Sequence, residues 1–338
     1  MLKIEGSWVW DFWIADDGDL FHLFFLHAPT SLCDETRRHR AARIGHAVST
    51  DLHRWELRDA PFGPGLPGQF DETATWTGSV IRDSAGMWWM FYTGARFLSS
   101  EPDQANIETI GAAVSTDLDS WTKLDSPLVS ADPRWYERWG TGAWKEESWR
   151  DPWVFPDPRG DGYRMLLTAR ANHGSVDARG VVGHARSRDL RRWEVLPPLS
   201  APGAGFAHVE VPQLVDVDGS WVLLFACSPD AMTAAHASRF ADAGTWVLLV
   251  DDPAAPFDLS AARPLTGSNL YSGRLVQQRD GSWVLLAFES SRTGGSFSSA
   301  ICDPIPFTIA DGEPRLGASR PATAAGPETS PCAAGAHG

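Results

Sequence analysis

The chain has few cysteines for its length, with four among 338 residues: Cys33, Cys227, Cys302 and Cys332. Their spacing fits neither a metal-binding motif nor the density of a disulfide-stabilised scaffold. We therefore expect four free thiols in a reducing compartment, which favours a cytoplasmic protein.

Positive charge is also scarce. The chain has 29 Lys and Arg against 43 Asp and Glu, which gives a net charge of −14 and a pI near 5.1. Because phosphate binding relies on concentrated positive charge, nucleic acid is not an expected partner. The one dense basic run, R-R-H-R at residues 37–40, is expected in a solvated loop, with a rim contact to an anionic substrate as the alternative.

Long apolar runs are missing as well. No segment approaches the length of a membrane span, so no membrane partner is expected. The first ten residues, M-L-K-I-E-G-S-W-V-W, have neither the basic nor the apolar stretch of a secretory signal. This start again favours a cytoplasmic location.

What the chain does contain is a long repeat built on five glycines, each of which ends a turn before an apolar run: Gly18, Gly86, Gly162, Gly219 and Gly281. Each turn separates two runs rich in β-branched and aromatic residues, which predicts a hairpin of two antiparallel strands. The glycines lie 68, 76, 57 and 62 residues apart, so we predict five such units.

A third element recurs in step with the hairpins. Similar segments begin at Ile44, Ile110 and Val182 and continue as S-x-D-L-x-x-W, and the runs from Gly244 and Phe297 are the expected third strands of the last two units. A short fourth strand completes each unit. The prediction is an all-β fold, a five-bladed β-propeller with four antiparallel strands per blade.

The propeller is expected to be one catalytic domain over residues 1–310. Residues 311–338 are mostly Ala, Gly, Pro, Ser and Thr, which predicts a mobile C-terminal tail that is too short for a second domain.

Tryptophan is abundant, with 17 residues. Six occupy repeat positions and are expected to wedge neighbouring blades together: Trp55, Trp89, Trp121, Trp193, Trp221 and Trp283. Trp10, Trp13 and Trp76 instead flank the expected first strands, where aromatic walls could hold a sugar ring, although core packing would explain such residues equally well.

The first strand of each blade lines the propeller axis, so residues at its start should converge on one pocket. Counting back from the glycines places five residues there: Asp11, Ser79, Asp151, Glu210 and Ser272. A single Asp at a strand start usually accepts hydrogen bonds from nearby backbone N–H groups. Three carboxylates at matched positions repel one another, however, so their convergence predicts a functional site.

Glycoside hydrolysis needs such an arrangement: one carboxylate that attacks the sugar or activates water, and one carboxylic acid that protonates the leaving oxygen. No cofactor is expected. No metal site is expected either, because the ten histidines show no ligand-type spacing, and a cation in the channel is the lesser alternative.

At these residues the chain resembles glycoside hydrolase families 32 and 68, which include invertases, levanases, inulinases and levansucrases. The resemblance covers about residues 6–310 and rests on four motifs: V-W-D-F-W-I at 9–14, W-T-G-S at 76–79, R-D-P at 150–152 and E-V-P at 210–212. Val211 stands where the families have Cys or Arg. Invertase-type members also carry a C-terminal β-sandwich, and we expect none in this chain.

The resemblance implies a role for each motif. Asp11 would be the nucleophile, Glu210 the acid/base, and Asp151 the residue that binds two hydroxyls of a fructosyl unit. Arg150 would orient a hydroxyl or pair with an adjacent acid. The further expected contacts to substrate are Trp10, Trp13, Trp76, Ser79, His208 and Ser272.

Three functions follow, in order of preference. The first is a retaining β-fructofuranosidase-like enzyme that hydrolyses or transfers a fructosyl unit of sucrose or a small fructoside. The second is an inverting furanosidase of the arabinanase and xylosidase type, and the third is a sugar-binding propeller without turnover. The expected partner in each case is a small sugar.

Overall fold

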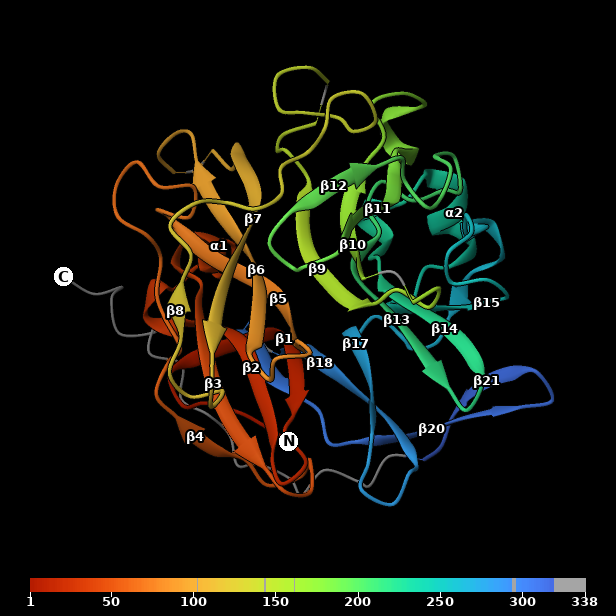
Figure 1. The fold of residues 1–338 in the computed structure, drawn as a ribbon. Coiled ribbons are helices and arrows are strands. Elements are labelled where there is room, and N and C mark those ends of the chain that lie inside the picture. The colour runs from red at the N-terminus through yellow and green to blue at the C-terminus, as the bar shows by residue number, and fades with distance from the viewer. Residues whose placement is uncertain (102, 143, 161, 294–295, 319–338) are drawn as a thin grey trace.

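The computed structural model describes the chain except residues 102, 143, 161, 294–295 and 319–338. Its described residues form five antiparallel sheets arranged around one axis, and the predicted all-β, five-bladed propeller is confirmed (Figure 1). In each blade the strands follow one another outward in chain order.

The strand bounds are as follows. Blade one contains β1 (Ser7–Asp16), β2 (Phe21–Pro29), β3 (Arg43–Ser49) and β4 (Glu56–Arg58). Blade two contains β5 (Ala74–Arg82), β6 (Trp88–Phe97), β7 (Asn106–Ser115) and β8 (Thr122–Lys123). Blade three contains β9 (Trp149–Pro156), β10 (Tyr163–Arg170), β11 (Gly180–Ser187) and β12 (Trp193–Leu196).

Blade four contains β13 (Glu210–Val217), β14 (Ser220–Ala226), β15 (Thr245–Val250) and β16 (Arg263–Pro264). Blade five contains β17 (Leu270–Gln277), β18 (Trp283–Thr293), β19 (Ser296–Ile301), β20 (Ile305–Ala310) and β21 (Glu313–Leu316). Here the third strand is divided, because β19 pairs with one part of β18 and β20 pairs with another.

Short helices fill the connections. The described residues include the α-helices α1 (Arg38–Ala41) and α2 (Ala234–Arg239), and the 3-10 turns η1 (Thr30–Leu32), η2 (Glu35–Arg37), η3 (Val176–Ala178), η4 (Pro229–Ala231) and η5 (Leu259–Ala261). The segment from η1 to α1 links β2 to β3 and contains the basic run of residues 37–40.

The hairpin turns are built as the repeat predicts. The five turn glycines adopt positive φ angles between 85° and 102°, a backbone region that favours glycine. Each turn thereby returns the chain into the second strand of its blade.

The ring closes between blades five and one. Leu2 forms an antiparallel bridge with Ile301, and β1 contacts β17, β18 and β19. The sheet of blade five includes β21, so the propeller continues beyond residue 310, where its end was predicted. Most of the predicted tail, residues 319–338, lies outside the described residues.

Five apolar clusters form the core, one between each pair of neighbouring blades. The six repeat tryptophans pack in or against these clusters, as predicted. Burial of aromatic rings between the blades therefore holds the sheets together and fixes the positions of the innermost strands.

Among the described cysteines, Cys227 and Cys302 are free and buried, whereas Cys33 is disulfide-bonded. The prediction of four free thiols is therefore wrong for Cys33, and Cys332 lies outside the described residues. No helix in the described part of the chain has the length and apolar character that a membrane span requires. The cytoplasmic location stays a prediction.

Candidate active site

Every first strand is interrupted by a β-bulge at the same depth. In β1 and β5 the extra residue is Asp11 and Thr77, respectively. In β9, β13 and β17 two residues oppose one on the neighbouring strand, and the first of the two is Asp151, Val211 or Ser272. A bulge places an extra residue on one strand and re-aims its side chain. The five bulges therefore turn side chains toward the propeller axis.

The bulges define two rings of equivalent positions. The residues immediately before the bulges are Trp10, Trp76, Arg150, Glu210 and Tyr271. The bulge residues themselves are Asp11, Thr77, Asp151, Val211 and Ser272. Glu210 thus occupies the position of Arg150 in the neighbouring blade, and not the position of Asp151.

Three bulge residues adopt a left-handed backbone, with φ of 57° at Asp151, 51° at Val211 and 52° at Ser272. This conformation costs about 1–3 kcal/mol in a non-glycine residue and is least favourable for a β-branched one. In return, the backbone N–H of Val211 donates to Asp151 Oδ2 at 3.2 Å. Val211, a departure from the resembled families, therefore contributes through its backbone.

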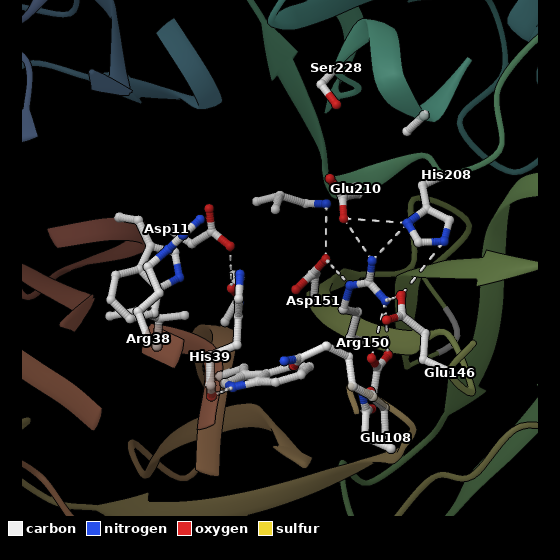
Figure 2. A pocket seen from close by; sticks show the side chains of 18 of the residues that line it. Asp11, Arg38, His39, Glu108, Glu146, Arg150, Asp151, His208, Glu210 and Ser228 are labelled. Carbon is white, nitrogen blue, oxygen red and sulfur yellow. Dashed lines mark hydrogen bonds and ion pairs between the residues drawn. The ribbon is translucent and has the colours of Figure 1, made fainter. Parts of the chain in front are cut away.

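All residues of the two rings except Ser272 line a cavity of about 810 Å³, which is large enough for a small sugar. Seven of the ten predicted site residues line it: Trp10, Asp11, Trp76, Arg150, Asp151, His208 and Glu210. Three carboxylates from blades one, three and four therefore meet in one pocket (Figure 2).

The other three predicted residues lie elsewhere. Trp13 is fully buried in the core between blades one and two, where it stacks on Phe24. Ser79 is buried and does not line the cavity; it accepts a hydrogen bond from the backbone N–H of Val154 at 3.0 Å and so joins blades two and three. Ser272 lies beneath the pocket and donates to Asp11 Oδ1 at 2.6 Å.

Asp11 is held by hydroxyl groups. Besides Ser272, the Thr77 hydroxyl donates to Asp11 Oδ2 at 2.9 Å. Burial raises the pKa of Asp11, and the neighbouring charge of Glu210 raises it further, while the two hydroxyls act in the opposite direction. Asp11 therefore retains a proton at a higher pH than an ordinary aspartate does.

Asp151 is buried more deeply among donors. The Thr168 hydroxyl donates to its Oδ2 at 2.6 Å, and Arg150 Nε lies 3.6 Å from the same oxygen. Burial raises the pKa of Asp151 to about 6 against the lowering effect of Arg150. The charge of Asp11 also raises it, which shows that the two aspartates share one electrostatic environment.

Arg150 joins the acids on the other side of the pocket. Its Nη1 donates to Glu108 Oε2 and to Glu146 Oε1, each at 3.1 Å, and its Nη2 donates to Glu210 Oε1 at 2.6 Å (Figure 2). With Asp151, four carboxylates surround one guanidinium. Burial raises the pKa of Glu108 to about 8, even though Arg150 lowers it.

Glu210 is stabilised as a carboxylate. Burial alone would raise its pKa, but the neighbouring His208 and Arg150, together with the hydroxyl of Tyr271 that donates to Oε2, lower it below the ordinary range. Arg150 Nη2 also lies 2.9 Å from His208 Nδ1. The same Nδ1 lies 3.5 Å from Glu210 Oε1, and Nε2 lies 3.3 Å from the Ser148 hydroxyl, so His208 links the guanidinium and the acid.

Several residues of the site were missed from the sequence: Thr77, Glu108, Glu146 and Tyr271 line the pocket, and Thr168 donates to Asp151. Thr77 and Tyr271 each lie next to a predicted residue in the sequence. A count that allowed for the bulge in each first strand would have selected them. Glu108 and Glu146 come from the third strand of blade two and from the loop before β9, and no repeat position marks them.

Among the described residues, His22, His46 and Asp119 bring their possible ligand atoms close enough together to hold a metal ion, and the expectation of no metal site stays a prediction. None of the three lines the pocket. His22 binds Asp17 at 3.2 Å and His46 at 3.0 Å.

Blade three has an equivalent row of contacting side chains, but this row cannot bind a metal ion. Arg164 takes the place of His22, between Asp157 at 3.0 Å and His184 at 3.4 Å. A guanidinium is not a metal ligand, so we interpret both rows as structural hydrogen-bonded stacks.

Residues 14–292 match the model of the glycosyl hydrolases family 32 N-terminal domain, a range that contains Asp151 and Glu210 and begins three residues after Asp11. No curated protein sequence matches the chain.

Solved structures with the same fold include an inulosucrase from Halalkalicoccus jeotgali bound to kestose, with 21% identity, a TM-score of 0.72 and coverage of 94% of this chain and 90% of that one. The β-fructofuranosidase catalytic domain of Microbacterium saccharophilum K-1 has 18% identity, a TM-score of 0.73 and coverage of 93% and 81%. A family 32 β-fructofuranosidase variant of Bombyx mori in complex with sucrose has 17% identity, a TM-score of 0.66 and coverage of 92% and 62%.

Proposed function

Because the chain belongs to glycosyl hydrolase family 32, we propose that it is a retaining β-fructofuranosidase-like enzyme that cleaves or transfers a fructosyl unit of sucrose or a small fructoside. The observation that carries the proposal is the meeting of Asp11, Asp151 and Glu210 in one cavity, with aromatic walls from Trp10 and Trp76. A glycosidase requires two such carboxyl groups beside the bond that it cleaves.

Asp11 attacks the anomeric carbon of the fructosyl unit, and the bond to the leaving oxygen breaks as Glu210 protonates that oxygen. The product is a fructosyl ester on Asp11. Water or a sugar hydroxyl then attacks the anomeric carbon, gives its proton to Glu210 and releases Asp11 as a carboxylate. Asp151 accepts hydrogen bonds from ring hydroxyls throughout.

The sugar-free site does not yet have the protonation that the first step needs. Glu210 is a carboxylate held by Arg150, while the pKa values of Asp11 and Asp151 are raised. Hydroxyls that donate to Asp151 stabilise its charged form and lower its pKa. We propose that sugar binding releases a proton from the aspartates and that Glu210 takes it up as the leaving oxygen separates its carboxylate from Arg150.

The test combines product stereochemistry with trapping of the intermediate. Wild-type protein with sucrose and methanol should form methyl fructoside of the β configuration. Glu210→Gln with a nitrophenyl β-fructofuranoside should accumulate protein heavier by one fructosyl unit in intact-mass spectra, and the added mass should map to the peptide that contains Asp11. The α product would indicate inversion, and a lack of turnover on every fructoside would indicate a binding propeller.

A further inference from the structure

Two groups of arginines lie at or near the pocket, and the first is the basic run of residues 37–40. This run is not the solvated loop expected from the sequence, because Arg38 and His39 line the cavity. Arg37 pairs with Glu101 at 2.8 Å, so the run is joined to the protein beside the wall that it forms. The second group is a largely buried ion-pair cluster that does not line the cavity.

Arg170, the last residue of β10, is at the centre of this cluster and is fully buried. Its Nε donates to Glu137 Oε2 at 2.8 Å. Its Nη1 and Nη2 donate to the backbone carbonyls of Ala207 and Val176, each at 2.7 Å. Arg179 Nη1 donates to the other oxygen of Glu137 at 2.8 Å. These charge-assisted hydrogen bonds hold the Arg170 guanidinium in one orientation.

The propeller repeat does not require an arginine at this position. Arg170 lies two residues after the residue that pairs with Arg150, immediately before the bulge. The same count in blades one, two and four gives Ala28, Ala95 and Ser228. A buried guanidinium costs free energy unless it is well paired, so a small side chain would serve the fold with less compensation. The arginine therefore points to a role that is particular to blade three.

Arg170 contacts His208 and its surroundings by two routes. The carbonyl that its Nη1 holds belongs to Ala207, the residue before His208. The guanidinium also lies over the ring of Trp144, 3.9 Å from the ring centroid, which is a cation–π geometry. The Trp144 ring in turn packs against the imidazole of His208, with centroids 4.9 Å apart. One guanidinium thus fixes both the backbone before His208 and the ring beside it.

The connection that carries Trp144 rests on the same cluster. The backbone N–H of Glu137 donates to the carbonyl of Arg170 at 2.8 Å, and a Cβ atom at Gly142 would overlap Glu137 Oε1. Glu146, two residues after Trp144, lines the cavity. The ion pair therefore helps to set the path by which this connection reaches the pocket.

His208 links the cluster to the acid/base. Its Nδ1 lies 3.5 Å from Glu210 Oε1 and 2.9 Å from Arg150 Nη2 (Figure 2). Burial raises the pKa of Glu210, and the contact with His208 is the largest influence that lowers it. A displaced His208 would therefore change both the orientation and the pKa of Glu210.

We infer that Arg170 is a positioning residue for the acid/base, which acts on Glu210 through Trp144 and His208 from outside the pocket. The inference rests on the proposed fructosidase function and adds a residue on which protonation of the leaving oxygen depends. Because a poor leaving group needs that proton most, the effect of Arg170 should depend on the leaving group.

The experiment compares methyl β-D-fructofuranoside, whose leaving oxygen needs a proton, with nitrophenyl β-fructofuranoside, whose leaving oxygen does not. The test variant combines Arg170→Met with Glu137→Gln, which removes the cation without leaving an unpaired buried carboxylate. It should lower kcat/KM for the methyl fructoside about tenfold or more and change kcat/KM for the nitrophenyl fructoside less than about threefold. Trp144→Leu, which removes only the ring between Arg170 and His208, should show the same dependence on the leaving group.

The matched control removes another buried ion pair of β10, with Arg164→Met and Asp157→Asn in one protein. Arg164 Nε lies 3.0 Å from Asp157 Oδ1, and neither residue lines the cavity. The control should keep the wild-type ratio of the two kcat/KM values even where its stability falls. Crystal structures give a measurement that needs no turnover: His208 should move away from Glu210 in the Arg170 variant and stay in place in the control.

An equal loss on both substrates, or His208 in its wild-type position in the Arg170 variant, would leave Arg170 a structural role only and overturn the inference. A changed ratio in the control would show that the ratio reports stability, with the same consequence. If the Arg170 variant does not fold, Trp144→Leu decides by the same comparison. If the wild type cleaves neither fructoside, the proposed function fails, and the crystal structures decide whether Arg170 positions His208.

Discussion

Asp11 and Glu210 belong to one pocket but to opposite electrostatic environments (Figure 2). Asp11 accepts hydrogen bonds from two neutral hydroxyls, and burial raises its pKa. Glu210 accepts from a guanidinium and a phenol, and its pKa is lowered. Neutral hydroxyl donors thus act on the pKa of Asp11, the nucleophile of our proposal. The charge of Arg150 acts on the pKa of Glu210, which exchanges protons.

Replacing the two carboxylates themselves gives the largest expected effect. Asp11→Asn and Glu210→Gln should each lower kcat for sucrose about 10⁴-fold or more. A nitrophenolate leaving group needs no protonation, so the first step of Glu210→Gln should recover with nitrophenyl β-fructofuranoside, whereas Asp11→Asn should stay inactive. A burst of nitrophenol measures the difference, and equal recovery of both variants would contradict the assignment of roles.

Removing the charge on the Glu210 side is the next test. Arg150→Met leaves Glu108, Glu146, Asp151 and Glu210 without their shared cation, so we expect kcat/KM to fall about 10³-fold and the free energy of unfolding in urea to fall by about 3–5 kcal/mol. Arg150→Lys, which keeps the charge but not the forked geometry, should recover stability more than activity. If Arg150→Met were as stable as the wild type, Arg150 would not be needed to stabilise the four buried carboxyl groups.

On the Asp11 side the expected effects are smaller. Thr77→Val or Ser272→Ala should lower kcat/KM about tenfold, because each removes a donor to the Asp11 carboxylate. Both hydroxyls lower the pKa of Asp11, so their loss raises it and moves the acid limb of the kcat/KM profile to higher pH. The matched control is Ser79→Ala, which should reduce stability by about 1–3 kcal/mol without moving the pH profile. A shift in the Ser79 variant would return that residue to the site.

The contrast between Thr77 and Ser79 also shows what the sequence could predict. Turn glycines and repeated strands gave the blade number and brought Asp11, Asp151 and Glu210 together, because the repeat fixes the strand that lines the axis. The position within that strand depends on a bulge. A bulge shifts the register without a sequence signature of its own, so counting back from the turn selected Ser79 in place of Thr77.

Residues outside the first strands were harder to predict for another reason. Glu108, Glu146 and His39 reach the pocket from a third strand and from two loops, whose paths depend on tertiary packing. The basic run was visible in the sequence, but its role was not, because the partners of the arginines lie in other segments, such as Glu101 and Asp103.

The pH dependence of kcat/KM of the wild type gives the finest test of the comparison. Its acid limb reports Asp11, and its basic limb reports the proton that later reaches Glu210. Under our proposal the sugar-free site must hold one proton that later reaches Glu210, and Asp151 holds it with a pKa of about 6. The profile of kcat/KM reports the free enzyme, so activity should be present below pH 6 and should fall about tenfold for each pH unit above it. The acid limb should then follow Asp11.

The hydroxyl of Thr168 offers a test between this explanation and one in which Glu210 receives its proton from solvent. Thr168 donates to Asp151 Oδ2 and lowers its pKa, so Thr168→Val should raise that pKa and move the basic limb to higher pH while the acid limb stays in place. Ser272→Ala should instead move only the acid limb, because the Ser272 hydroxyl lowers the pKa of Asp11. If both variants moved the same limb, or if the basic limb were unchanged in Thr168→Val, the aspartates and Glu210 would not share a proton, and Glu210 would have to receive it directly from solvent.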